Sequence, residues 1–116
     1  MLSLPPSVKV FLCAKPTDMR RSFDGLAAMT EAVLKQDPFS GHLFVFRNRR
    51  GDRLKVLYWD RGGYAIWYKR LEEGLFRMPY CEGDSAELDA SDLALILDGF
   101  DIDLAERRPR FNPRRA

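Results

Sequence analysis

The sequence predicts an α+β domain: an antiparallel β-meander of four to five strands, with one longer helix packed on a face of the sheet and a short C-terminal helix. With 46% hydrophobic and 12% aromatic residues, the 116-residue chain has enough apolar side chains for one core. Three β-branched and aromatic runs are joined by short connections that contain glycine, and two segments carry apolar residues at helical spacing. We expect one domain over residues 1–105 and a basic tail, disordered in isolation, over residues 106–116.

The first third of the chain predicts one strand and the longer helix. Residues 8–14 form a short apolar run that is typical of a strand. Residues 17–35 place apolar side chains at three- and four-residue spacing, and Thr17 or Ser22 can serve as the N-cap. Pro38 follows, and the residue before a proline disfavours helical geometry, so the helix ends before it.

The middle of the chain carries the strongest β signal. The apolar and aromatic runs are residues 43–46, 54–59 and 64–71, and residues 48–52 and 60–63 connect them. Connections this short can join only antiparallel neighbours, so a three-stranded meander is expected.

The last part of the chain adds weaker signals. Residues 75–78 are a candidate fourth strand of the meander. A short helix over residues 91–98, at the edge of the sheet, can be capped by Asp89 or Ser91 and stopped by Gly99.

Charge is distributed unevenly, although the chain carries a net charge of only +2. Residues 47–70 have a local net charge of +6, residues 82–106 hold nine acidic and no basic side chains, and the last ten residues hold five arginines. This distribution suits a protein with one face for a polyanion and another for a different partner. The alternative is that the acidic and basic segments neutralise each other within the fold.

The sequence also indicates a compartment. The first residues lack the basic and long apolar regions of a secretory leader, and no apolar run approaches the roughly 20 residues that span a bilayer. Cys13 and Cys81 are too few for a disulfide framework, so both are expected as reduced, buried thiols. A cytoplasmic protein without membrane contact is expected.

Few residues suggest catalysis. His42 is the single histidine, which excludes paired-histidine metal sites, and its pairing with the Cys13 thiol as a nucleophile has no sequence signature. Five aspartates could in principle hold two metal ions, but each has a simpler place at a helix start, before a proline or in a turn: Asp18, Asp24, Asp37, Asp52 and Asp60. We therefore predict no catalytic residue, no metal site and no cofactor.

Basic and aromatic residues are interleaved in the meander, a pattern that suits nucleic-acid binding. Burial in the core is the favoured interpretation of the rings of Phe44, Phe46, Trp59 and Trp67. The arginines around residues 48–52 must reach solvent, and an arginine-rich hairpin tip fits a DNA groove; a solvated basic loop is the alternative. The candidate DNA-binding residues are Arg47, Arg49, Arg50, Arg53, Lys55, Lys69 and Arg70.

Four ordered motifs carry a family resemblance over about residues 8–100. They are the sequences PTDMRRSFDGL at residues 16–26, DPFSG at 37–41, LFVF followed by RRGDR at 43–53, and WYKRLE at 67–72. They closely resemble the small accessory protein, called TnpB, of the second open reading frame in insertion sequence 66 type elements. The residues at 60–64 depart from the Gly-rich or apolar residues of many relatives, and the acidic segment and arginine tail look individual.

The resemblance implies association with a transposable element that also encodes a larger transposase, and it brings no known active site. The leading hypothesis is a non-catalytic accessory that contacts DNA, at element ends or target, through the seven basic residues. The alternative is an adaptor whose acidic segment or apolar sheet face docks on the transposase without contacting DNA; an enzyme ranks third. The sequence indicates no oligomeric state.

Overall fold

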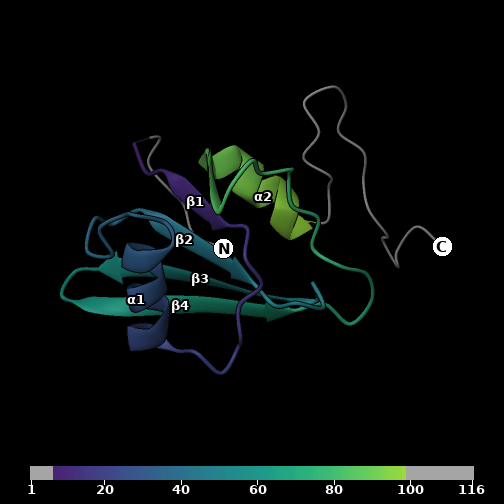
Figure 1. Cartoon of the computed structure of the whole chain (residues 1–116), viewed down its shortest axis with the longest axis horizontal. Helices are drawn as coiled ribbons and strands as arrows, with labels where there is room; N and C mark the ends of the chain where they lie inside the picture. The colour runs from purple at the N-terminus through teal and green to yellow at the C-terminus, as the bar shows by residue number, and fades with distance from the viewer. Residues whose placement is uncertain (1–6, 99–116) are drawn as a thin grey trace.

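The computed structural model describes residues 7–98 as a five-stranded mixed sheet with two helices (Figure 1). In chain order the elements are β1 (Val10–Cys13), α1 (Phe23–Ala32), β2 (Leu43–Arg47), β3 (Arg53–Asp60), β4 (Gly63–Arg70), β5 (Ser85–Leu88) and α2 (Ala90–Asp98). The expected helix stop at Gly99 and the basic tail over residues 106–116 lie outside the described residues.

The predicted pairing of the three central runs is confirmed, because β2 pairs antiparallel with β3 and β3 with β4. The sheet as a whole is not the antiparallel meander that we predicted. Its order is β4-β3-β2-β1-β5, and β1 pairs parallel with β2. The connection between these two strands contains α1, and a parallel pair needs such a crossover to bring the chain back to the same end of the sheet.

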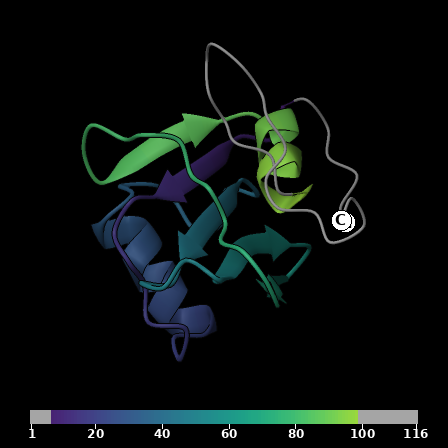
Figure 2. The ribbon, with the colours of Figure 1, turned by 90° about the vertical axis from the view of Figure 1, so that its right-hand side faces the viewer.

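The fifth strand was not predicted. β5 pairs antiparallel with β1, with Val10 opposite Leu88 and Cys13 opposite Ser85, and Figure 2 shows the two strands side by side. Polar and apolar residues alternate along β5, but over only four positions, and none of them is β-branched or aromatic. The strand signal of this segment is therefore weak.

The prediction of a strand at residues 75–78 is wrong, because this segment is irregular. The Phe76 side chain is buried, and its amide donates to the carbonyl of Gly51 at 2.8 Å. The segment is thus held by its apolar side chain and by the β2–β3 turn, not by a strand ladder.

α1 begins later than the predicted start at residue 17. Its N-cap is Ser22, which makes no side-chain capping hydrogen bond. The Nζ atom of Lys55 donates to the carbonyls of Met19 and Arg21, both at 2.8 Å. A tertiary contact therefore holds the preceding loop, residues 16–21, outside the helix.

Local hydrogen bonds set the next two helix boundaries. Lys35 adopts a φ of 56°, and the Gln36 amide donates to the Thr30 carbonyl at 3.1 Å, which closes the end of α1 before the predicted boundary. Of the two cap candidates for α2, the carboxylate of Asp89 accepts the amide of Asp92 at 2.8 Å.

The two faces of the sheet carry separate clusters of buried side chains, and Figure 2 shows α1 and α2 on opposite sides of the sheet. On one face, residues of α1 and its C-terminal end lie with sheet residues: Phe11, Cys13, Leu26, Ala27, Leu34, Phe44, Phe46 and Leu57. On the other, α2 and Phe76 contribute to a second cluster: Val10, Leu12, Leu43, Val45, Leu54, Val56, Phe76, Leu93, Ile96 and Leu97.

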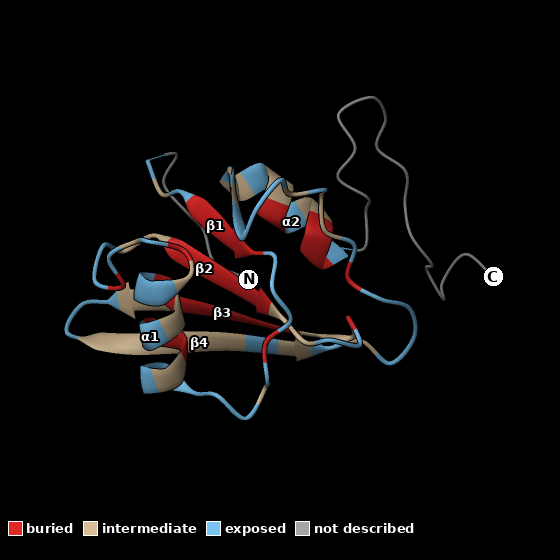
Figure 3. Ribbon diagram, in the orientation of Figure 1, coloured by how far each residue is buried: buried red, intermediate tan, exposed pale blue. Residues whose placement is uncertain are grey.

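The position of α2 differs from the sheet edge where we expected it. The Lys69 Nζ on β4 donates to the Leu97 carbonyl at 3.2 Å, so the C-terminal end of α2 lies within one lysine side chain of the edge strand opposite β5. Because both faces are covered, β1 and β2 are buried almost throughout, whereas β4 is mostly half-buried (Figure 3).

Candidate nucleic-acid interface

The turn between β2 and β3, residues 48–52, is organised by one side chain. The Asn48 Oδ1 accepts the amides of Gly51 at 2.9 Å and Arg53 at 3.0 Å, and its Nδ2 donates to Asp52 Oδ1 at 2.7 Å. The last of these bonds lowers the pKa of the Asp52 carboxyl. Gly51 has a φ of 86°, a conformation that other residues adopt only with strain. The turn is therefore ordered before any ligand arrives.

Residues 71–76 also hold the turn in place. The Arg47 Nη1 donates to the Phe76 carbonyl at 2.8 Å, and the Leu71 amide donates to the Asp52 carbonyl at 2.8 Å. Together with the bond between Phe76 and Gly51, these contacts hold residues 71–76 against the base of the turn. Arg47 is half-buried in this arrangement, so it supports the turn instead of extending into solvent.

Three of the predicted basic residues are well placed for an external ligand. Arg49 and Arg50 are exposed at the turn, and the only ion pair that the described residues offer Arg50 is a contact of 3.8 Å between its Nε and Asp52 Oδ2. Arg53 follows at the start of β3, where its Nη1 donates to the Tyr68 hydroxyl at 3.3 Å. A distant, exposed ion pair contributes little, so the guanidinium groups of Arg49 and Arg50 can turn to an incoming anion.

Lys55, unlike these arginines, is buried. Its side chain is 8% exposed, bonded to the loop of residues 16–21 and 4.8 Å above the Tyr68 ring. Reaching a phosphate would break two hydrogen bonds of a buried ammonium group. Lys55 therefore stabilises the loop of residues 16–21 next to the site and does not itself extend into solvent.

The remaining two predicted residues lie on opposite faces of β4. Lys69 is paired with Leu54 on the α2 face and bonds to the end of that helix, whereas Arg70 is opposite Arg53 and forms an ion pair of 2.9 Å with Glu72. The seven predicted residues thus do not form one surface. Arg70 is exposed beside Arg53 and extends the arginine cluster, and Lys69 does not.

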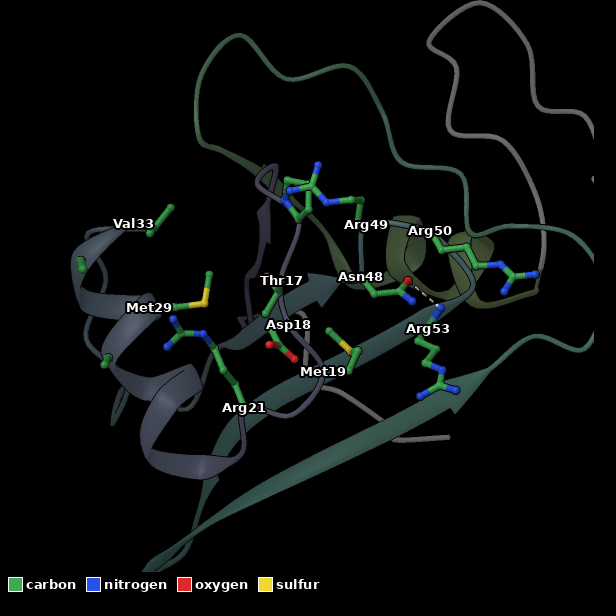
Figure 4. Close-up of a pocket in the computed structure, with 13 residues that line it drawn as sticks. Thr17, Asp18, Met19, Arg21, Met29, Val33, Asn48, Arg49, Arg50 and Arg53 are labelled. Carbon is green, nitrogen blue, oxygen red and sulfur yellow. Dashed lines mark hydrogen bonds between the residues drawn. The ribbon is translucent and has the colours of Figure 1, made fainter.

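A groove of about 880 Å³ adjoins the turn and brings in a residue that sequence reasoning missed (Figure 4). It is lined by the loop of residues 16–21, the outer side of α1 and the turn: Pro16, Thr17, Asp18, Met19, Arg21, Ala28, Met29, Ala32, Val33, Asn48, Arg49, Arg50 and Arg53. Arg21 was part of the family motif but far in sequence from the basic middle, and only the covering loop brings it to the same groove.

The acidic residues do not assemble a metal site. Among residues 7–98, no three histidine, cysteine, aspartate or glutamate side chains gather where they could hold an ion. Asp18, at the groove, is bound by Arg20 at 2.6 Å, and this hydrogen-bonded pair lowers the pKa of the Asp18 carboxyl to about 2. Its charge is therefore already matched by a cation of the chain itself.

The cysteine and histidine do not form a nucleophilic pair either. Cys13 is at the C-terminal end of β1, and His42 lies just before β2, where its Nδ1 accepts the amide of Lys9 at 3.0 Å. Because β1 and β2 run parallel in register from Val10 and Leu43, the two side chains sit at opposite ends of the pair. Burial raises the pKa of the Cys13 thiol, which opposes thiolate formation.

Replacing Asn48 with alanine should lower the free energy of unfolding by about 2–3 kcal/mol, since each lost hydrogen bond of this kind contributes roughly 1 kcal/mol. Urea unfolding of the full chain measures the difference. Arg49→Ala is the matched control, one residue away and exposed, with an expected change below about 0.5 kcal/mol. Equal midpoints for the wild type and Asn48→Ala would show that the turn is not organised by this side chain.

Comparisons with known proteins add the following. A family model described as IS66 Orf2 like protein matches residues 8–107. Two proteins of Sinorhizobium fredii (strain NBRC 101917 / NGR234) are similar: the uncharacterized protein y4hO, 40% identical over 87% of this chain and 88% of its own, and the uncharacterized protein y4jC, 32% identical over 97% of both. No solved structure matches. Neither α1 nor α2, the helices of the described residues, has the length and apolar character needed to traverse a bilayer.

Proposed function

The chain belongs to the IS66 Orf2-like family, and from this premise we propose that it is a non-catalytic accessory protein in the transposition of a bacterial insertion sequence, which contacts DNA through the arginines of the β2–β3 turn. The family supports the role in transposition. DNA contact is the further step, and either the element ends or the target could supply the duplex. The transposase of the same element is the expected protein partner.

The observation that carries DNA contact is the ordered presentation of Arg49 and Arg50. Asn48 and residues 71–76 fix the backbone of the turn, so little further conformational entropy is lost when its guanidinium groups meet phosphates. Arginine provides several donors in a planar fork that matches phosphate oxygens and guanine edges. Arg53, Arg70 and Arg21 extend the same positive region, whereas Arg47, Lys55 and Lys69 support the fold behind it.

The test is the binding of the full chain to duplex DNA over a series of salt concentrations. Arg49→Glu/Arg50→Glu should weaken binding on the order of tenfold or more at low salt and should make the slope of log affinity against log salt shallower by about one unit per lost phosphate contact. Exposed turn substitutions should leave stability within about 0.5 kcal/mol of the wild type.

Lys9→Glu/Arg61→Glu is the matched control. It changes the net charge by the same amount, but both side chains are exposed at the opposite end of the strands from the turn. This control should retain the wild-type salt slope. If both double variants lost affinity equally, binding would follow net charge alone, and the assignment to the turn would fail.

A docking role on the transposase, without DNA contact, is the second candidate. An aromatic cluster at the far end of β3 and β4 favours it: the Phe39 ring is 56% exposed and lies 5.0 Å from Trp59 and 5.5 Å from Tyr64 between ring centroids. Exposed aromatic clusters are typical of protein interfaces. A wild-type chain that bound the transposase but showed no salt-dependent binding to DNA would place this candidate first.

A further inference from the structure

β4 is an open edge of the sheet that residues 7–98 build. The strand order places β4 at one end and β5 at the other, and Figure 1 shows β4 as the outermost strand beside β3. An edge strand presents a row of unpaired amides and carbonyls, which is a template for another strand. Proteins usually protect such an edge, so an unprotected one points to a partner that adds a strand to it.

The two edges differ in their protection. β5 has only four residues and carries the exposed charge of Glu87. β4 has eight residues, and all of them pair with β3 in unbroken register, so no bulge interrupts the strand. Residues 64–68 of β4 include no charge and no proline, and its two basic residues, Lys69 and Arg70, stand together at the C-terminal end. The features that normally prevent strand addition are therefore missing from most of β4.

The hydrogen-bond register identifies the backbone groups that face outward from β4. The Leu71 amide donates to the Asp52 carbonyl at 2.8 Å, which makes this pair a hydrogen-bonded one. Hydrogen-bonded and non-hydrogen-bonded pairs alternate along an antiparallel ladder. Every second residue therefore points its amide and carbonyl away from β3: Tyr64, Ile66, Tyr68 and Arg70. No hydrogen bond between described residues uses these outward groups.

The side chains of β4 also leave surface for a neighbouring strand to cover. All eight are half-buried or exposed. On the α1 face, Tyr64 and Ile66 pack against the buried cluster from its border, and Tyr68 is 48% exposed. On the other face, Ala65 and Trp67 are half-buried. A strand added to this edge would bury apolar surface on both faces of the sheet, which favours association.

A second β4 is a self-complementary partner for this edge. When two copies pair antiparallel about Trp67, Tyr64 of one copy lies opposite Arg70 of the other, and Ile66 lies opposite Tyr68. All four outward residues of each strand then have a partner, and each opposite pair exchanges two hydrogen bonds. A register with Ile66 opposite itself would place Arg70 opposite Gly62, which lies in the turn before β4. The register about Trp67 is therefore the one that uses the whole edge.

Charge favours the same antiparallel arrangement. Burial raises the pKa of the Tyr64 hydroxyl, and so do the negative charges of three carboxylates: Glu31, Asp37 and Asp24. Arg70 stands at the other end of β4, and its exposed ion pair with Glu72 contributes little. Antiparallel pairing brings the guanidinium group of each copy to the end of β4 where the other copy carries these carboxylates.

We propose that two copies of the chain associate through antiparallel pairing of their β4 edges, centred on Trp67, and that the two sheets become one continuous sheet. The β2–β3 turns of the two copies then lie at opposite ends of the paired strands, because Arg53 and Arg70 mark the same end of each copy. The interface consists of protein groups alone, so it does not rest on the proposed DNA contact.

Amide hydrogen exchange of the wild-type full chain, followed by NMR at several protein concentrations, tests this pairing directly. The four outward amides of β4 should be protected at high concentration and should lose that protection on dilution. Sedimentation velocity should show a dimer that dissociates over the same concentration range. The amides of residues 65, 67 and 69 face β3 and are the internal control, since they should stay protected throughout.

Three results of this experiment would overturn the proposal. Fast exchange of the outward amides at every concentration, in a monomeric chain, would show that the edge stays open. Protection that persists in a chain shown to be monomeric would mean that another part of the same chain covers the edge. A dimer with unprotected outward amides would associate through a different surface.

Tyr68→Pro provides an independent test, and Tyr68→Ala is its matched control. Both variants lose the same ring, but only proline removes the outward amide, and an edge strand tolerates proline where the missing N–H faces away from the sheet. Tyr68→Pro should weaken self-association on the order of tenfold or more relative to Tyr68→Ala, because each dimer loses two hydrogen bonds. Circular dichroism checks that both variants are folded. Equal self-association of the two folded variants would overturn the proposal, and the exchange of the wild type decides the matter if Tyr68→Pro does not fold.

Discussion

Replacing Phe44 with alanine is expected to lower the free energy of unfolding by about 3–5 kcal/mol, the usual range for a fully buried phenylalanine. Phe44 is 0% exposed, lies on the central strand β2 and stacks on Phe11 with 5.8 Å between ring centroids. α1 and the sheet enclose it on the same face, so the neighbours cannot collapse fully into the space left by the ring. Natural domains are stable by only about 5–15 kcal/mol, which makes this a large fraction of the total.

Thermal unfolding followed by circular dichroism checks this prediction, since each lost kcal/mol should lower Tm by roughly 4–8 °C in a domain of about this size. Tyr80→Ala is the contrasting control because that ring is 87% exposed, and Tm should change little. A variant at Phe44 that kept its Tm but lost DNA binding would contradict burial as the role of this ring and would favour base stacking.

Replacing Lys55 with methionine is expected to lower the free energy of unfolding by about 2–4 kcal/mol, because two hydrogen bonds from a charged donor are lost and each contributes roughly 1.5–3 kcal/mol, less the desolvation of the ammonium group. The methionine side chain fills a similar volume, so no large cavity accompanies the change. The carbonyls of Met19 and Arg21 lose their donor, and the loop of residues 16–21 is released from the sheet.

This loop forms one wall of the groove, so the substitution should also disturb Met19 and Arg21, which line it. Limited trypsin digestion should cleave faster after Arg20 and Arg21 in Lys55→Met than in the wild type, while urea unfolding measures the stability change. Lys9→Met, at an exposed lysine, should alter neither. An unchanged unfolding midpoint with unchanged cleavage would show that Lys55 does not hold the loop.

The candidate site was predictable from the sequence only where geometry is local. Arg49 and Arg50 occupy a short connection between two strands, and side chains of such a turn reach solvent whatever the rest of the fold does. Lys55 also reads as a polar position in an alternating strand, facing outward. In the folded chain the loop before α1 covers Lys55. The residues of this loop lie more than thirty positions from Lys55, so the local sequence pattern could not predict its burial.

Local sequence patterns were sufficient to predict the central hairpins, the helical nature of two segments and the family. Period-two apolar runs joined by glycine turns leave β2, β3 and β4 one way to pair, because the chain between them is too short for any other. Helical spacing and the cap at Asp89 likewise act within one or two turns.

Three features depend on contacts that form only in the folded chain: the parallel place of β1, the existence of β5 and the division of the basic residues between exposed and internal positions. β1 and β5 find partners across long connections, so their pairing depends on which edge of the sheet is free and not on neighbouring residues. Arg47, Lys55 and Lys69 became internal donors for the same reason: each meets a backbone carbonyl from a segment at least 28 positions away, Phe76, Met19 and Leu97 respectively. Buried carbonyls need donors, and long basic side chains are able to supply them.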